Sequence, residues 1–261
     1  MGRGSSGRSS RSQRVSTPRQ IETPESERQG ERQDRTPERL YDFFRTASDE
    51  DADKMLDEWR QERMDEDGRS NNNDIQRFFH YVGWTENTPV TLSEEQYQAA
   101  YRAAGSPEQI YHADYDASNA TAQEFADQYF GQARNKDGKA YRQYVSNGIF
   151  GGGTYFANRA GESAAYGTNQ FRGFLNHSAK PVEFTALHKQ FSQAPASLKR
   201  VIYKMTSGYG GDSEKLSIFA AMKGYNVITL KGTGYYVVLD RRATTVSTRT
   251  RKDLSYRMDN W

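Results

Sequence analysis

Apolar residues are distributed unevenly along the 261 residues of this chain. Residues 1–36 consist mainly of Gly, Ser, Arg, Gln, Glu and Pro, with hardly an apolar side chain beyond Val15 and Ile21. A segment of this kind cannot bury enough surface to offset the conformational entropy that it loses on folding. The pattern therefore predicts a disordered basic and polar arm over 1–36.

Between residues 37 and 107 the apolar residues recur at helical spacing. Thr36-Pro37 combines a capping hydroxyl with a proline at the first helical position, and Ser93 with Gln96 fits a capping box. Acidic residues come after Ser48, where they would lie at the positive end of a further helix. We therefore expect a helical region over 37–107, either packed on the C-terminal part of the chain or serving as a docking surface.

Short extended and helical patterns alternate after residue 107, and this mixture predicts an α+β domain over 108–243 rather than a doubly wound sheet. Strands are expected at 110–112, 154–157, 182–184, 225–230 and 235–240, the last two forming a hairpin. Helices are expected from Thr121, at 185–193, at 195–205 and at 213–223, with a glycine-rich loop at 207–212. From Thr244 to 261 the chain is basic and polar, and we expect a loose tail.

Composition narrows the classes of function. The net charge of +2 does not by itself indicate a nucleic-acid-binding protein, although basic residues concentrate in the two tails. The absence of cysteine excludes disulfides, thiolate nucleophiles and thiolate zinc sites. No apolar run is long enough to span a bilayer, and the basic N-terminus lacks the apolar core of a signal peptide. We therefore expect a soluble protein in the cytoplasm of the cell that makes it, with no membrane partner.

One stretch, residues 146–167, concentrates unusual residues. Three glycines at 151–153 predict a sharp bend or a close approach of backbone to a ligand, and an extended run comes after them. A short helical turn then places Ser163 and Tyr166 eight and eleven residues after Tyr155. Two tyrosine rings and a serine hydroxyl beside glycine backbone, which has no side chains in the way, suit a flat aromatic ligand that carries an amide. A strand–turn–helix corner with tyrosines packed for bulk is the simpler alternative.

Several familiar sites are excluded by pattern. The glycines are not followed by Gly-Lys-Ser/Thr as in a P-loop, nor by the long helix of a dinucleotide fingerprint. His112, His177 and His188 lack metal-type spacing to one another or to acids, so no metal site is predicted. No Gly-x-Ser-x-Gly elbow supports a serine hydrolase.

The remaining pattern resembles the diphtheria-toxin-like and poly(ADP-ribose) polymerase-like ADP-ribosyltransferases. The first motif of that family, a strand histidine followed by a small residue, is matched by residues 111–113, Tyr-His-Ala. The second motif, Gly-x-Gly-x-Tyr-Phe-Ala followed by Ser-Ala-x-Tyr, is matched without a gap by 151–157 and 163–166. The likeness covers roughly residues 108–242. The C-terminal half of this region also resembles, more weakly, the ADP-ribosyltransferase domains of bacteriophage head-associated and prophage proteins. This second resemblance lies in the general residue pattern rather than in a motif.

The resemblance implies a split antiparallel sheet with a nicotinamide pocket between its halves, and NAD as co-substrate. His112 would bind a ribose hydroxyl of NAD, and the Ala113 backbone would bind the carboxamide, although the family usually has glycine there. Tyr155 and Tyr166 would sandwich the nicotinamide ring, and the Ser163 hydroxyl would hold its amide. Gly153 and Thr154 belong to the same cofactor-binding motif.

The third motif departs from the family. In the polymerases a glutamate opens the late strand and orients the NAD ribose and the acceptor, whereas Tyr235 stands at that position here. The loss of this carboxylate argues against chain elongation but leaves transfer of a single ADP-ribose open. Glu214, beside the glycine-rich loop, is a candidate replacement, so the predicted catalytic residues are His112, Tyr155, Tyr235 and Glu214.

The sequence thus leads to the hypothesis of an NAD-dependent mono-ADP-ribosyltransferase of phage or bacterial origin. The expected acceptor is a protein, with nucleic acid open through the basic tails. An inactive NAD- or ADP-ribose-binding module is the alternative, favoured by the missing glutamate. A virion-associated component, whose helical region docks on capsid or portal proteins, is a further alternative.

Overall fold

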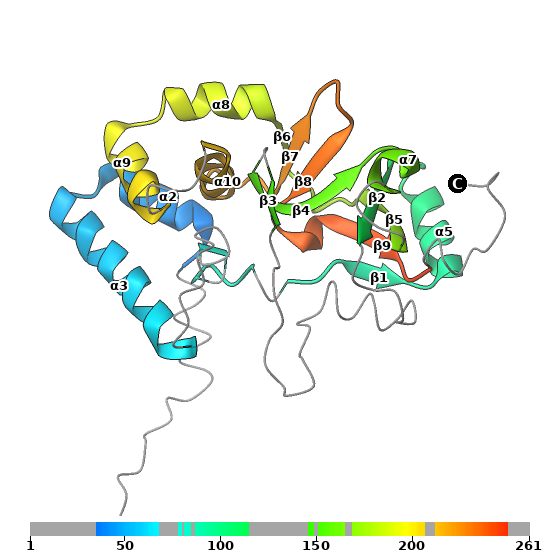
Figure 1. Ribbon diagram of the computed structural model, residues 1–261, viewed down its shortest axis with the longest axis horizontal. Coiled ribbons are helices and arrows are strands. Elements are labelled where there is room, and N and C mark those ends of the chain that lie inside the picture. Colours follow the sequence, from blue (N-terminus) through cyan, green and yellow to red (C-terminus); the bar gives the residue numbers. More distant parts are fainter. Residues whose placement is uncertain are drawn as a thin grey trace, which may run out of the picture.

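The computed structural model describes residues 35–67, 78–79, 81–84, 87–114, 146–148, 151–164, 169–206 and 212–249. Several predictions lie outside the described residues. These are the arm up to residue 34, the helix from Thr121, residues 207–211 of the glycine-rich loop, Tyr166 and the tail from 250 to 261. The described part is a mixed sheet with helices packed against it, so the α+β prediction is confirmed (Figure 1).

Eight strands lie side by side in the order β1-β9-β5-β2-β4-β8-β7-β6, and β3 pairs with β4 outside this order. Their bounds are Val90–Leu92 (β1), Gln109–Asp114 (β2), Ser146–Gly148 (β3), Gly151–Ala157 (β4), Asn169–Leu175 (β5), Pro181–Glu183 (β6), Val227–Leu230 (β7), Tyr235–Val238 (β8) and Thr244–Ser247 (β9). The edge pairs β1–β9 and β6–β7 are parallel and the other pairs are antiparallel. The sheet is therefore open and mixed, and antiparallel only in its interior.

The described helices are Pro37–Thr46 (α2), Asp49–Asp67 (α3), Glu94–Ala103 (α5), Ala160–Ser163 (α7), Phe184–Ser192 (α8), Ala196–Met205 (α9) and Asp212–Met222 (α10), with a 3-10 turn (η3) at Arg241–Ala243. Two predicted caps are confirmed. The Thr36 hydroxyl accepts a hydrogen bond from Arg39 N, and Ser93 forms a capping box with Gln96. Local sequence therefore fixes where these two helices begin.

One half of the sheet, β4-β8-β7-β6, is covered by an apolar helical layer. Helices α2, α8, α9 and α10 share a buried cluster with the inner face of this half, in which Val237 and Ile228 are fully buried (Figure 1). Leu40 and Phe44 of α2 belong to the same cluster. The helical segment from residue 37 therefore shares one hydrophobic core with the sheet.

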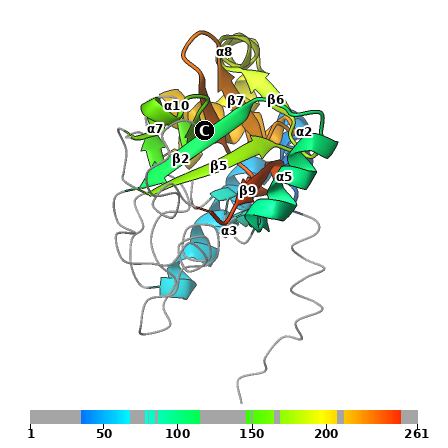
Figure 2. The same ribbon diagram turned by 90° about the vertical axis from the view of Figure 1, so that its right-hand side faces the viewer.

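The other half, β1-β9-β5-β2, is covered by α5 through aromatic and charged contacts (Figure 2). Tyr97 of α5 lies 5.5 Å, centroid to centroid, from the ring of Phe174 on β5. The guanidinium of Arg172 lies 5.1 Å from the centroid of the Tyr97 ring and forms an ion pair with Glu94. Glu94 also accepts a hydrogen bond from Ser247 of β9. A charge pair with a buried arginine and a half-buried glutamate thus joins α5 to two strands.

Two predictions about local structure are wrong. The sequence predicts a bend at glycines 151–153, but these residues open strand β4. A Cβ at Gly153 would lie 2.6 Å from Val237 Cγ1 and 2.8 Å from Val238 O, so this glycine permits close contact with β8 rather than a turn. The sequence also predicts a loose tail from Thr244, but Thr244–Ser247 form the buried strand β9. Pairing with β5 and β1 on its two sides satisfies the backbone of this polar strand.

A third correction concerns the region predicted to be helical over 37–107. Val90–Leu92 form strand β1, which pairs in parallel with β9 at one edge of the sheet. The run Val-Thr-Leu has β-prone residues but is too short to show alternation. This run forms a strand because it pairs with β9, which lies more than 150 residues later in the sequence.

Candidate functional site

The two halves of the sheet meet at a seam between β2 and β4, and the first two sequence motifs lie on these strands. Tyr111 and Ala157 form the one residue pair in the described ladder between β2 and β4, whereas β2 pairs with β5 over six residues. Beyond that pair, Nδ1 of His112 lies 2.6 Å from the carbonyl oxygen of Tyr155. The His112 ring thus contacts a carbonyl of β4 at the point where the backbone pairing of β2 with β4 ends.

The histidine and the tyrosine leave opposite faces of the sheet. His112 pairs across the strands with Phe171 and its ring lies 5.4 Å from that of Phe156, so it shares the face that buries these two rings. Tyr155 pairs with Val237 and packs, half-buried, against the cluster under the helical layer. A ligand that contacts both side chains must therefore lie in the seam itself rather than on one face.

The serine of the second motif is brought to the same seam by α7, which packs against both β2 and β4. Ser163 is buried, its hydroxyl donates a hydrogen bond to Ala160 O at 3.2 Å, and it accepts one from the Gln170 side chain. Gln170 is the cross-strand partner of Ala113, which is also buried. The residues of the two motifs therefore converge, with the Ser163 hydroxyl already engaged by neighbours.

Two further predicted cofactor-binding residues lie near the start of β4. Gly153 is pressed against β8, where a Cβ would meet Val237. Thr154 is 6% exposed, and its hydroxyl oxygen is buried without a hydrogen-bond partner among the described residues. Burying a hydroxyl group without a hydrogen-bond partner costs free energy, because the group loses its hydration. Among the predicted cofactor-binding residues that the structure describes, the Thr154 hydroxyl is therefore the group with the least evident structural role.

The two candidates for the third motif lie toward different ends of β4. Tyr235 pairs with Ala157 at the end of β4. Glu214 lies in the first turn of α10, three residues before Ser217, whose hydroxyl accepts a hydrogen bond from Gly152 N at 3.0 Å. This hydrogen bond attaches α10 to the start of β4. Glu214 therefore lies toward the start of β4, whereas Tyr235 lies at its end.

A carboxylate that sequence reasoning missed is bonded to the strand that opens at Tyr235. Glu108 accepts hydrogen bonds from the Tyr236 hydroxyl and from Asn158 Nδ2. Burial, and then the hydrogen bond to Glu108, raise the pKa of the Tyr236 hydroxyl above its ordinary value, so it stays protonated and donates. Glu108 directly precedes β2, and only the sheet pairing shows its position beside β8. No local motif marks it.

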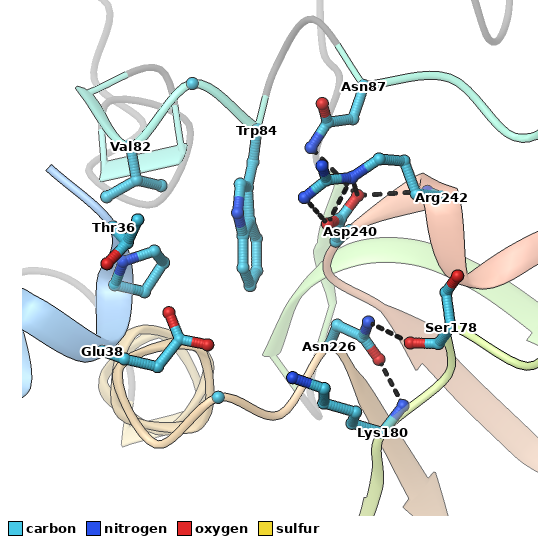
Figure 3. Close-up of a pocket in the computed structure, with 13 residues that line it drawn as sticks. Thr36, Glu38, Val82, Trp84, Asn87, Ser178, Lys180, Asn226, Asp240 and Arg242 are labelled. Atoms are coloured by element: carbon cyan, nitrogen blue, oxygen red, sulfur yellow. Dashed lines mark hydrogen bonds and ion pairs between the residues drawn. The ribbon is translucent and has the colours of Figure 1, made fainter. Parts of the chain in front are cut away.

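A pocket of about 530 Å³ lies elsewhere, at the opposite end of β8 (Figure 3). None of the predicted nicotinamide-site residues that the structure describes lines it. Its lining comes from the start of α2, from residues 82–84 and 87, from the loop before β6, and from the residues flanking β7 and β8: Thr36, Pro37, Glu38, Val82, Gly83, Trp84, Asn87, Ser178, Lys180, Gly224, Asn226, Asp240 and Arg242. Sequence reasoning missed this pocket because its residues come from segments far apart in the chain.

Within the described part of the chain, no group of three or more His, Asp or Glu side chains is placed to hold a metal ion. Among the helices that the structure describes, none combines the length and the apolar character needed to cross a bilayer. Comparison with known proteins found no matching family model, no similar curated protein and no similar solved structure.

Proposed function

We propose that the protein is an NAD-dependent mono-ADP-ribosyltransferase whose nicotinamide site lies at the seam between β2 and β4. The observation that carries this proposal is the convergence of His112, Tyr155 and Ser163 at one seam, although 51 residues separate the first from the last. The late strand β8 pairs directly with β4, as Tyr235 with Ala157, so the third-motif position is also adjacent. These are the residues that the resemblance assigns to NAD.

In the proposed reaction, the bond between the nicotinamide nitrogen and ribose C1′ breaks, and its electron pair leaves with nicotinamide. A nucleophilic side chain of a protein acceptor then forms the new bond to C1′ and loses its proton. Tyr155 contributes an aromatic face to the leaving ring, and His112 contributes a ring nitrogen to a ribose hydroxyl. Interactions that strengthen as positive charge develops on the ribose would accelerate this step.

The Thr154 hydroxyl adds support to this proposal. It is buried beside the seam without a partner in the described structure, and a buried polar group is usually satisfied. A ligand that enters between β2 and β4 would supply the missing hydrogen bond. The same residue belongs to the motif that the family uses for NAD.

The test is release of labelled nicotinamide from NAD by the parent protein and by Tyr155→Ala, Tyr155→Phe and His112→Ala. Removing the Tyr155 ring should lower the rate roughly tenfold or more, whereas phenylalanine keeps the aromatic face and should retain most activity. Tyr203→Ala is the matched control, because Tyr203 is a tyrosine on α9 that is 50% exposed. Thermal unfolding of each variant shows whether it is folded. If the folded parent neither binds NAD nor releases nicotinamide, this function is wrong.

A second candidate function is an NAD- or ADP-ribose-binding module without turnover. It is favoured by Tyr235, which replaces the expected carboxylate, and by the Ser163 hydroxyl, which is engaged by Ala160 and Gln170. Calorimetric titration with NAD distinguishes the two candidates. Binding that is lost in Tyr155→Ala, together with no nicotinamide release by the parent, would identify the module.

A further inference from the structure

Gln170 of β5 carries a buried acceptor that the proposed reaction does not use. The residue is 1% exposed, and its Oε1 is buried without a hydrogen-bond partner in the described structure. Buried polar atoms of folded proteins are nearly always hydrogen-bonded, because an unpaired one loses its hydration without compensation. The position of this oxygen therefore indicates where a donor is missing.

The nitrogen of the same amide is fully engaged. Nε2 donates to Ala160 O at 2.6 Å and also to the Ser163 hydroxyl, so both of its protons are used. Turning the amide over would place Oε1 against the Ala160 carbonyl oxygen, where two acceptors would repel each other. The orientation of the amide is thus fixed, and Oε1 can be satisfied only by a group that donates.

Gln170 and Tyr155 share one face of the sheet. The cross-strand partner of Gln170 on β2 is Ala113. Tyr111 of β2 pairs with Ala157 of β4. Side chains two residues apart on a strand share a face, so Ala113 and Tyr155 lie on the face of that pair. Between the strands of Gln170 and Tyr155, this face of β2 therefore presents the small side chain of Ala113.

Helix α7 holds the Gln170 amide on the side of its strand that faces the seam. Ala160 and Ser163, which bind Nε2, both belong to α7, and this helix packs against β2 and β4. The Gln170 side chain therefore extends from β5 across β2 toward the seam. Its amide lies on the face of Tyr155, beside the serine that the proposed site uses for the carboxamide of nicotinamide.

The charge on α7 favours a neutral ligand at this place. Glu162 directly precedes Ser163, and one of its carboxylate oxygens is buried without a hydrogen-bond partner in the described structure. Its other oxygen lies 3.7 Å from the guanidinium of Arg159, whose side chain is 78% exposed. An anion that entered the seam beside α7 would approach this carboxylate and the Gln170 oxygen, whereas an N–H donor would be attracted to both.

From this arrangement we propose that Gln170 is a specificity-determining residue of the nicotinamide site, and that its Oε1 accepts an N–H of the ligand's carboxamide. This inference rests on the proposed NAD function of the seam. A primary amide supplies the missing donor, whereas the carboxylate of nicotinate has acceptors only and a negative charge. The site therefore selects NAD over the same dinucleotide with nicotinate in place of nicotinamide.

The test is calorimetric titration of the full chain with these two dinucleotides. The parent should prefer NAD by about a hundredfold or more, because the analogue leaves a buried acceptor unpaired. Gln170→Leu removes the acceptor and should lower this preference about tenfold. Gln193→Leu, at an exposed glutamine that ends α8, is the matched control and should keep the preference of the parent.

Two additions guard against a misfolded variant. Gln170→Met is a second uncharged replacement, with an unbranched side chain closer in shape to glutamine, and thermal unfolding identifies which variants are folded. Competition with free nicotinamide and free nicotinate needs the parent alone. Nicotinamide should displace NAD at a concentration at least tenfold lower than nicotinate.

Three results would overturn the proposal. Equal affinity of the parent for the two dinucleotides would show that Gln170 does not select the amide, and the NAD function would stand. An equal loss of affinity for both dinucleotides in folded Gln170→Leu would show that the residue only attaches α7 to β5. A folded parent that binds neither dinucleotide would overturn this inference together with the proposed function.

Discussion

The two halves of the sheet are stabilised by different interactions. The half β4-β8-β7-β6 is covered by helices through an apolar cluster, whereas the half β1-β9-β5-β2 is joined to α5 by the ion pair between Arg172 and Glu94. At the seam the halves are connected by one residue pair and by the contact of His112 with Tyr155 O. The hydrogen bonds of Glu108 and a second apolar cluster, to which Ile110 and Val238 both belong, also join them in the described structure. Each half can therefore be weakened separately, by packing in the first and by charge in the second, while the candidate NAD site lies between them.

The largest effect is expected from Gly153→Ala in the apolar half. The added Cβ would lie 2.6 Å from Val237 Cγ1 and 2.8 Å from the carbonyl oxygen of Val238, and the backbone atom cannot move aside without opening the β4–β8 ladder. We expect a loss of about 3 kcal/mol in the free energy of unfolding, measured in urea. Gly161→Ala is the control, because nothing lies within 4 Å of its Cβ. Equal stability of the two variants would show that β4 and β8 are not packed this closely.

The charged half should respond to pH. Burial by itself would raise the pKa of Glu94, but hydrogen bonds from Gln98, Ser247 and Arg172 hold it below its ordinary value of 4.5. The folded state therefore binds the proton less tightly than the unfolded state. The resulting stabilisation is complete above the unfolded value and is lost as pH falls through the lowered folded value.

Glu94→Gln should accordingly lower the free energy of unfolding at pH 7 by about 1–2 kcal/mol, because Arg172 is 8% exposed and keeps only a neutral acceptor. The variant should also lose part of the acid dependence of the parent between about pH 5 and 3, where glutamate ordinarily titrates, as judged by urea unfolding at several pH values. Glu95→Gln changes the neighbouring acid on the same helix and serves as control. Parallel pH profiles for Glu94→Gln and the parent would contradict the assigned role of the pair.

A smaller effect is expected where α10 is attached to the start of β4. Ser217 is fully buried and its hydroxyl accepts a hydrogen bond from Gly152 N at 3.0 Å. Ser217→Ala leaves this N–H without its acceptor, so we expect a loss of about 1 kcal/mol. Ser192→Ala removes an exposed hydroxyl at the end of α8 and should change stability less. Hydrogen exchange of the Gly152 amide should quicken in the first variant and not in the second.

The smallest effect is expected at the seam, with the opposite sign. Thr154→Val replaces a buried hydroxyl that has no partner in the described structure by a methyl group, and should stabilise the protein by about 0.5–1 kcal/mol. If the hydroxyl serves NAD, the same variant should release nicotinamide more slowly while melting at a higher temperature. A variant that is less stable than the parent would show that Thr154 has a structural partner.

Local patterns predicted much of the secondary structure. The caps at Thr36 and Ser93 and the hairpin of β7 and β8 all derive from residues close together in sequence. The convergence of His112 with Tyr155 was predicted only through the family resemblance, since neither spacing nor composition contains the pairing of β2 with β4. The bend at 151–153 was predicted wrongly. A glycine that allows close packing against a neighbouring strand, as Gly153 does against β8, cannot be told from a turn glycine by the local sequence.

From the sequence alone it was possible to predict the starts of α2 and α5, the extended runs that became β2, β4, β6, β7 and β8, and the order of the motif residues along the chain. Long-range contacts were needed to show that His112 and Tyr155 leave opposite faces, that Thr244–Ser247 form a buried strand, and that Trp84 and Lys180 line one pocket. The physical reason is the range of the interactions. Capping and turn formation act between residues a few positions apart, whereas the pairing of β2 with β4, the pairing of β9 with β5 and β1, and the pocket depend on partners more than 40 residues away.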